Sequence, residues 1–95
     1  MKISVIIVTY ESQREIRLCL ESLYNHTKNF EFEVIVVDNN SKDSTKKIVK
    51  DNFKNIKIIE NSTNSGFSVA NNQGAKLASG EFLFFLNPDS ALNEN

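Results

Sequence analysis

Short apolar runs alternate along the chain with segments in which apolar residues recur every three or four positions. A run that is apolar at consecutive positions is typical of a strand buried on both faces, and such strands belong to parallel sheets. These runs predict strands at residues 3–8, 32–37, 56–59 and 81–86. The helical spacing predicts helices at residues 14–26, 44–52 and 67–78.

The order β-α-β-α-β-α-β, with short connections, defines the expected fold class. Right-handed crossovers between parallel strands give an α/β fold whose open, mostly parallel, doubly wound (Rossmann-like) sheet carries helices on both faces. No internal repeat, low-complexity tract or linker divides the sequence. We therefore expect residues 1–95 to form a single domain, with no element predicted after residue 89.

Local signals suggest where the helices begin and end. Ser12 followed by Glu15 matches a capping box, and Ser41 or Asp43 is the expected cap of the second helix. Gly80 is the expected stop of the third helix. That helix has small residues on one face, at Ala70, Gly74 and Ala78. A small-residue face predicts close packing against the sheet.

Composition places the chain among ordinary globular proteins and argues against one class of partner. Of its 95 residues 40% are hydrophobic and 24% charged, and the formal net charge is -1. Without a basic surface, nucleic-acid binding is not expected. No stretch approaches the ~20 apolar residues of a membrane span, so any membrane association would come from regions outside this chain.

The chain contains one cysteine, Cys19, which cannot form an intramolecular disulfide. This fits a reducing compartment, and we expect a cytoplasmic protein. Cys19 lies in a predicted helix with no histidine near it in the sequence. A packing role is therefore favoured over a role as a nucleophile.

Polar residues follow the carboxyl ends of the predicted strands, which is where ligands bind in open α/β sheets. The candidate ligand-binding residues at these ends are Thr9, Tyr10, Glu11, Asp38, Asn40, Asn87 and Asp89. Residues 9–11 can contact a base or ribose, and Asp38 can accept a hydrogen bond from a base N–H. Each residue alone also suits a turn or a helix cap. Two strand-end aspartates in one crevice favour binding.

Asp89 is the candidate metal ligand because it lies on a turn stiffened by Pro88, directly after a strand expected to be buried. Mg²⁺ and Mn²⁺ prefer few carboxylates, combined with phosphate oxygens and water. Asn87 offers only a neutral carbonyl or an amide donor. An ordinary turn is the alternative interpretation of Asn87-Pro88-Asp89.

The sequence has neither a Gly-x-Gly-x-x-Gly motif after the first strand nor a Walker lysine motif. The loop of residues 64–67 opens the third helix instead, and its Gly66 would let the backbone approach a ligand. A helix start capped by Asn or Ser is the alternative interpretation of this loop.

Four motifs occur together in a recognisable order and spacing. They are Val5-Ile6-Ile7-Val8-Thr9-Tyr10, Val36-Val37-Asp38-Asn39-Asn40-Ser41 continuing to Thr45, Asn64-x-Gly66-Phe67 with Asn72-x-Gly74, and Leu86-Asn87-Pro88-Asp89. Together they resemble glycosyltransferase family 2, and the resemblance covers essentially the whole chain. It implies the N-terminal, nucleotide-sugar-binding half of a GT-A fold.

The resemblance implies transfer of a sugar from a nucleotide diphosphate donor to an acceptor hydroxyl, with inversion at the anomeric carbon. Thr9 and Glu11, with Tyr10 beside them, would flank the base and ribose. Asp38 would bind the pyrimidine, and Gly66 would lie in the loop that passes the donor.

The sequence departs from the family pattern at Asn87, which takes the place of the first Asp of an Asp-x-Asp motif. Asp89 matches the last Asp and would hold the Mn²⁺ or Mg²⁺ that bridges the diphosphate. The Asn-Pro-Asp version resembles a rhamnosyltransferase-like branch whose donors are often dTDP-sugars. The expected donor is thus a UDP-sugar or a dTDP-sugar.

The family's second half supplies the acceptor site and the general base, so we expect both beyond residue 95 and assign no catalytic residue here. The implied acceptor is a glycan or a lipid-linked molecule, in the synthesis of cell-surface polysaccharide or glycan. A sheet edge that this second half would cover predicts self-association into a homo-oligomer.

Two other interpretations stay open at the level of the sequence. The chain could be a non-catalytic fragment that binds nucleotide and metal without turnover. It could also be a signalling receiver domain, which has a similar β/α order and strand-end aspartates. A receiver domain needs an acidic pair after the first strand, and Thr9-Tyr10 disfavours it.

Overall fold

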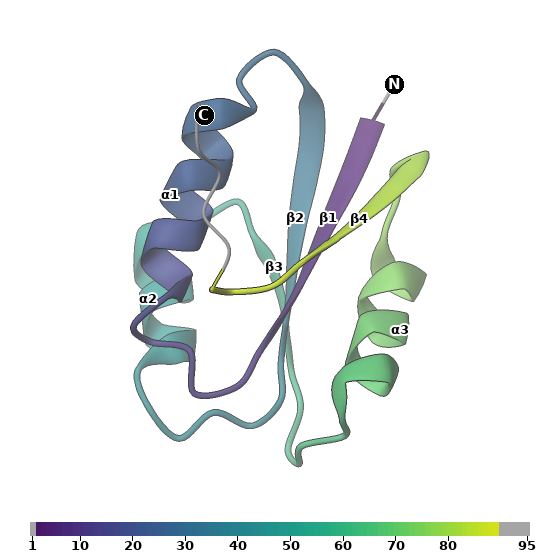
Figure 1. The fold of residues 1–95 in the computed structure, drawn as a ribbon. Helices are drawn as coiled ribbons and strands as arrows, with labels where there is room; N and C mark the ends of the chain where they lie inside the picture. The colour runs from purple at the N-terminus through teal and green to yellow at the C-terminus, as the bar shows by residue number, and fades with distance from the viewer. Residues whose placement is uncertain (1, 90–95) are drawn as a thin grey trace.

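The computed structural model describes residues 2–89, which form a parallel sheet with helices on both faces (Figure 1). The elements are β1 (Lys2–Thr9), α1 (Ile16–His26), β2 (Glu31–Asp38), α2 (Thr45–Asn52), β3 (Lys57–Glu60), α3 (Phe67–Leu77) and β4 (Phe82–Leu86). Their order and type are those predicted from the sequence. Among residues 2–89, no helix has the length and apolar character needed to cross a membrane.

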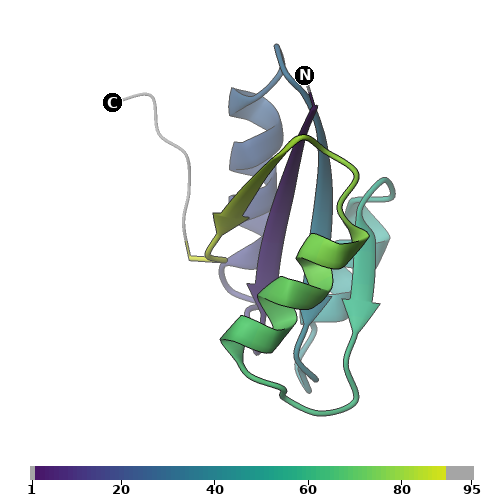
Figure 2. The ribbon, with the colours of Figure 1, turned by 90° about the vertical axis from the view of Figure 1, so that its right-hand side faces the viewer.

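The strand order is β3-β2-β1-β4, and each neighbouring pair is parallel. Helices α1 and α2 cover one face of the sheet, and α3 covers the other (Figures 1 and 2). The chain first adds strands on one side of β1 and then crosses to add β4 on the other side. This confirms the doubly wound α/β fold.

The core consists of two layers separated by the central strands β1 and β2. Side chains at alternate positions, such as Val5 and Val34, pack against α1 and α2. Their neighbours, such as Ile6 and Ile35, pack against α3. Because both faces are covered, these strands are apolar at consecutive positions, as expected for a parallel sheet.

Helix α3 approaches the sheet closely through its predicted small-residue face. Ala70 and Gly74 are buried there. A Cβ atom on Gly74 would lie 2.6 Å from Cγ2 of Ile6 and 3.3 Å from Cγ2 of Val37. The absence of a side chain at Gly74 therefore sets the distance between α3 and the sheet.

Two residues that the sequence analysis placed at helix ends, Gly80 and Ser12, do not have the predicted roles in the structure. Helix α3 ends at Leu77 with Ala78 as its cap, so the prediction of Gly80 as the stop is wrong. Gly80 is needed for close approach, since a Cβ there would lie 2.6 Å from Ser4 Oγ and 2.8 Å from Ser4 N. Helix α1 likewise lacks the predicted side-chain cap, and the Ser12 carbonyl accepts the N–H of Ile16 instead.

Strand β4 is not the buried strand that its sequence suggested. Its side chains from Phe82 to Phe85 are 45–53% exposed. The reason is its position, because β4 forms an edge of the sheet and pairs only with β1 among residues 2–89. Apolar content cannot distinguish a strand at an edge from one at the centre.

The amino-terminal side of the sheet is tied together by Glu33 on β2. Its carboxylate accepts hydrogen bonds from Ser4 Oγ on β1, from the Ser79 N–H before β4, and from Lys57 Nζ on β3 at 3.1 Å. The Glu33 side chain is only 11% exposed. Burial alone would raise the pKa of Glu33, but the hydrogen bonds outweigh it and lower that pKa to about 2.

The lowered pKa of Glu33 predicts a loss of stability in acid. An unfolded Glu has a pKa near 4.5, so the ionised folded state is favoured above that pH. This contribution, on the order of 2 kcal/mol, should be lost progressively as the pH falls from about 4.5 toward 2. Urea unfolding at pH 7, 4.5 and 2.5 measures it.

The comparison variant is Glu33→Gln, which should be less stable at pH 7 and should show a weaker decline in acid. Glu31→Gln, at an exposed position on the same strand, should behave like the unmodified chain. Equal acid sensitivity of the Glu33→Gln variant and the unmodified chain would show that Glu33 does not provide this stability.

Candidate functional site

The strand order reverses beside β1, and this places a crevice between the carboxyl ends of β1 and β4. Helix α1 leaves β1 for one face of the sheet, while α3 lies on the other face (Figure 2). Two adjoining pockets of about 290 and 310 Å³ open there. Both are lined by Tyr10, Ser12, Asn87 and Pro88. The sequence predicted a ligand site at the carboxyl ends of the strands, without indicating which of them border it.

The structure brings four of the predicted site residues together in this crevice. Tyr10, 53% exposed, and Asn87 border both pockets, while Glu11 and Asp89 line the second one. The first pocket continues toward α3 through Asn64 and Phe67. The crevice therefore combines an aromatic ring, amides and carboxylates.

Thr9 and Asp38 lie behind the crevice and not in it. Both are 0% exposed. Thr9 Oγ1 donates to Asp38 Oδ1 at 2.7 Å, as does Ser41 Oγ, and the Ser41 N–H donates to Asp38 Oδ2 at 2.8 Å. Both oxygens of Asp38 thus have protein donors. In this structure its carboxylate fixes the start of the β2–α2 loop.

Asn39 lies in the crevice, although the sequence analysis did not select it. Successive side chains of an extended strand point to opposite faces, so Asn39 faces away from Asp38, toward α3. It lines the first pocket. Its Oδ1 accepts from Asn61 Nδ2 at 2.9 Å, and its Nδ2 donates to Gly66 O at 3.2 Å. Strand alternation indicates that Asp38 and Asn39 face opposite ways, but it does not indicate which of them faces the crevice.

Gly66 begins α3 with φ 86°, in the left-handed region that favours glycine. Its N–H donates to Asn64 Oδ1 at 2.9 Å, and its carbonyl accepts from Asn39 and from the N–H of Ala70. Gly66 itself does not line either pocket, but its neighbours Asn64 and Phe67 do. Its contribution is to the shape of the loop.

Asn40, the remaining candidate, also has a left-handed backbone, with φ 68°. It is partly buried and lines neither pocket. It lies where the chain turns out of β2, between Asn39 in the crevice and Ser41 beneath it. Asn can adopt this conformation at lower cost than most residues.

The predicted metal ligand Asp89 is exposed at the second pocket, which Glu11 and Glu15 also line. Within residues 2–89, no three His, Cys, Asp or Glu side chains are grouped closely enough to hold a metal ion by themselves. A site with one carboxylate fits Mg²⁺ or Mn²⁺ that takes its other ligands from a diphosphate and from water. The donor set is compatible with the predicted metal but incomplete without a ligand.

Cys19 packs beneath the turn that carries Asp89, and it is 2% exposed. Its Sγ lies 3.7 Å from Asn87 O. Burial, and then the charge of Asp89, raise the pKa of Cys19 to about 11. A thiol with this pKa stays protonated at neutral pH, as expected for a packing residue.

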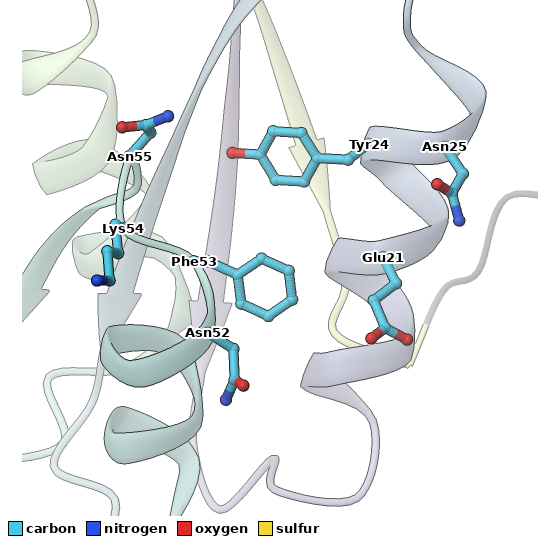
Figure 3. A pocket seen from close by; sticks show the side chains of 7 residues that line it. All are labelled: Glu21, Tyr24, Asn25, Asn52, Phe53, Lys54 and Asn55. Atoms are coloured by element: carbon cyan, nitrogen blue, oxygen red, sulfur yellow. The ribbon is translucent and has the colours of Figure 1, made fainter.

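A separate pocket of about 460 Å³ lies away from the carboxyl ends of the strands (Figure 3). It is formed at the C-terminal ends of α1 and α2, with Tyr24 and Phe53 as its aromatic residues. Both helices run antiparallel to the strands, so their C-terminal ends, and this pocket with them, lie at the amino-terminal end of the sheet. None of the predicted site residues lines it.

Comparison with known proteins agrees with this geometry. Residues 4–95 match the family model of glycosyl transferase family 2. The chain is 40% identical over 94 residues to poly(ribitol-phosphate) beta-glucosyltransferase of Bacillus spizizenii, covering 94% of this chain and 15% of that protein. It is 41% identical over 98 residues to the poly(ribitol-phosphate) beta-N-acetylglucosaminyltransferase TarS of Staphylococcus aureus, covering 99% of this chain and 17% of that protein.

The crystal structure of S. aureus TarS 1-349 in complex with UDP-GlcNAc has a TM-score of 0.88 and 41% identity. The match covers 99% of this chain and 28% of that one. The chain belongs to glycosyltransferase family 2, and its structure matches the GT-A region of TarS. It spans about a sixth of the length of the two curated relatives.

The family match decides one of the alternatives and leaves another prediction without support. The receiver-domain interpretation is wrong, because the matched family covers nearly the whole chain. The two relatives are named for transfer of glucose and of N-acetylglucosamine. Neither name supports the rhamnosyltransferase-like branch, which stays a prediction.

The contacts of Asp38 predict a stability defect for Asp38→Asn. An Asn offers one acceptor oxygen and an NH₂ group, so at least one donor of Ser41 or Thr9 loses its partner in a buried place. The free energy of unfolding should fall by about 2 kcal/mol. Asp51→Asn, at an exposed position of α2, should change it by less than about 0.5 kcal/mol. Equal stability of the two variants would contradict the assigned contacts.

Proposed function

We propose that the chain binds the nucleotide part of a nucleotide-sugar donor in the crevice between β1 and β4. The observation that carries this proposal is the meeting of Tyr10, Asn39, Asn87 and Asp89 at the point where the strand order reverses. The TarS structures in complex with UDP and with UDP-GlcNAc support it, because they match this chain at TM-scores of 0.87 and 0.88. A UDP-sugar is therefore the first donor to test, and a dTDP-sugar the second.

The charges around the crevice support a divalent cation as cofactor. Three carboxylates, those of Glu11, Glu15 and Asp89, line the second pocket, and no Lys or Arg within residues 2–89 lines either one. A diphosphate would be repelled by these carboxylates unless a cation were bound with it. Asp89 is the proposed ligand, and the bound ion would stabilise the charge on the leaving diphosphate.

We further propose that a longer protein containing this chain transfers the sugar with inversion. The acceptor hydroxyl oxygen forms a bond to the anomeric carbon as the bond to the diphosphate breaks, and a base outside residues 1–95 takes the hydroxyl proton. The acceptor would be a glycan or a lipid-linked molecule used for a cell-surface polymer. We place the reaction in the cytoplasm, with membrane attachment only through regions outside this chain, and expect the exposed β4 edge to favour self-association.

Calorimetry with UDP and dTDP, with and without Mn²⁺, tests donor binding. UDP should bind, and more tightly with Mn²⁺. Asp89→Ala should weaken binding in Mn²⁺ by about tenfold, equivalent to ~1.4 kcal/mol, because the metal loses its protein ligand. In the absence of metal, the same substitution should not weaken binding, because it removes a carboxylate that repels the diphosphate.

The control for this substitution is Asp51→Ala, which removes an exposed carboxylate from α2 without touching the crevice. It should bind UDP like the unmodified chain. If neither UDP nor dTDP binds under any condition, the proposed donor site does not exist. If binding survives in Asp89→Ala with full Mn²⁺ dependence, the metal ligand is elsewhere.

The chain alone should not transfer sugar, because the proposed general base lies outside residues 1–95. The purified 95-residue protein should release no sugar product from UDP-glucose or UDP-GlcNAc with ribitol phosphate polymer as acceptor, although it binds UDP. A product assay by mass spectrometry measures this. Multiple turnovers by this chain would show that the catalytic base lies within residues 1–95.

A further inference from the structure

The loops that follow β1 and β2 are joined by several hydrogen bonds, of which Glu11 makes three and its neighbours Ser12 and Gln13 make others. Its Oε2 accepts the N–H of Lys42 and, at 3.2 Å, the N–H of Asp43. Its own N–H donates to Ser41 Oγ at 2.8 Å. The side chain and the backbone of one residue thus hold three consecutive residues of the neighbouring loop.

Two residues of these loops have a left-handed backbone. Glu11 has φ 51° and Asn40 has φ 68°, and a left-handed backbone costs most residues other than glycine on the order of 1 kcal/mol or more. Such conformations persist when the surrounding contacts fix them. At Glu11, the contacts to residues 41–43 are the ones that do so.

The same hydrogen bonds continue into the core. Ser41 Oγ, which accepts from the Glu11 N–H, donates to the buried Asp38 Oδ1 at 2.7 Å. Thr9 Oγ1 donates to the same oxygen. The position of the Glu11 loop is therefore tied, through Ser41, to the buried carboxylate between β1 and β2.

Tyr10 is held between these fixed points. Thr9 on one side is anchored by Asp38, and Glu11 on the other by the β2–α2 loop. Of these three residues, Tyr10 alone borders both crevice pockets, and it is 53% exposed. Ser12 Oγ lies 3.2 Å from both the N and the O of Tyr10, so the backbone that carries the ring is also held locally.

We infer that Glu11 is a positioning residue whose carboxylate clamps the amides of Lys42 and Asp43, and so fixes Tyr10 in the crevice, without contacting the ribose. This inference rests on the proposed donor site, and it differs from the role that the family resemblance implied for Glu11. An acidic side chain suits the clamp because a carboxylate accepts two backbone N–H bonds strongly.

Nucleotides with and without ribose hydroxyls distinguish the clamp from a direct contact. Glu11→Ala should weaken binding of UDP and of 2′,3′-dideoxy-UDP by the same factor, about tenfold, because the loop loses the two side-chain hydrogen bonds to Lys42 and Asp43 whichever ligand is bound. A ribose contact through the other carboxylate oxygen predicts weaker binding of UDP only. Calorimetry with both ligands in Mn²⁺ measures the two factors, and a loss confined to UDP would overturn the inference.

Two further variants separate positioning from a loss of fold. Glu11→Gln keeps an oxygen that can accept from Lys42 and Asp43, and should restore UDP binding to within about threefold of the unmodified chain. Glu21→Ala removes an exposed carboxylate of α1 at the remote pocket of Figure 3. It should leave binding unchanged.

Amide hydrogen exchange tests the clamp without any nucleotide, and so independently of the proposed function. The amides of Lys42 and Asp43 should exchange faster in Glu11→Ala than in the unmodified chain, and at unchanged rates in Glu21→Ala. Unchanged exchange at both amides in Glu11→Ala would overturn the clamp, even if UDP binds. Faster exchange in a chain that binds no UDP would instead retain the clamp and reject the donor site.

Discussion

The parallel pairing of β1 with β2 is the constraint on which the candidate site depends. The register runs from Lys2 opposite Glu31 to Thr9 opposite Asp38, and both strands are buried on both faces. A slip of one residue would move every side chain to the other face, so the register is strongly specified. Because of it, the two strands end at the same level, and Thr9 reaches Asp38.

A buried carboxylate at this level organises the loops that leave β1 and β2. A charge that is 0% exposed is tolerated only when hydrogen-bond donors surround it, and Asp38 has three of them within the protein. One donor group, the Ser41 side chain, is shared with the Glu11 loop. Because the buried Asp38 carboxylate requires hydrogen-bond donors, it helps to fix the conformation of both loops.

Sequence patterns were sufficient for the elements, because a helix with one buried face leaves a period of apolar residues and a strand buried on both faces leaves an unbroken apolar run. The strand-end rule also located Tyr10, Glu11, Asn87 and Asp89 in one crevice. It could not show which way consecutive residues point, and so it selected Asp38 and missed Asn39. Whether Asp38 or Asn39 faces α3 depends on how β2 is oriented in the sheet, and the residue types at positions 38 and 39 do not indicate it.

Contacts between distant residues were equally beyond local patterns. Glu11 and Lys42 are 31 positions apart, and Glu11 by itself matches both a ribose ligand and a helix-start residue. The same limit explains Gly80, whose requirement comes from Ser4 on another strand. Residues that act through a partner become recognisable only when the fold places the partner beside them.

The two sides of the crevice differ in how firmly the described residues hold them. The side with Tyr10 is fixed by Thr9, Asp38 and the Glu11 contacts, most of them buried or partly buried. The side with Asp89 follows β4, whose side chains are about half exposed, and one weak contact from Cys19 supports its turn.

The other edge strand of the sheet, β3, exposes its apolar side chains less than β4 does. Strand β3 is short and ends in Glu60, which forms ion pairs with Lys46 and Lys50. Charged, short edges resist further pairing, whereas an uncharged apolar edge invites it. The placement of Asp89 is therefore sensitive to whatever covers β4, while the placement of Tyr10 is set by the β1–β2 pair. The proposed base contact at Tyr10 and the proposed metal ligand Asp89 therefore have separate structural origins.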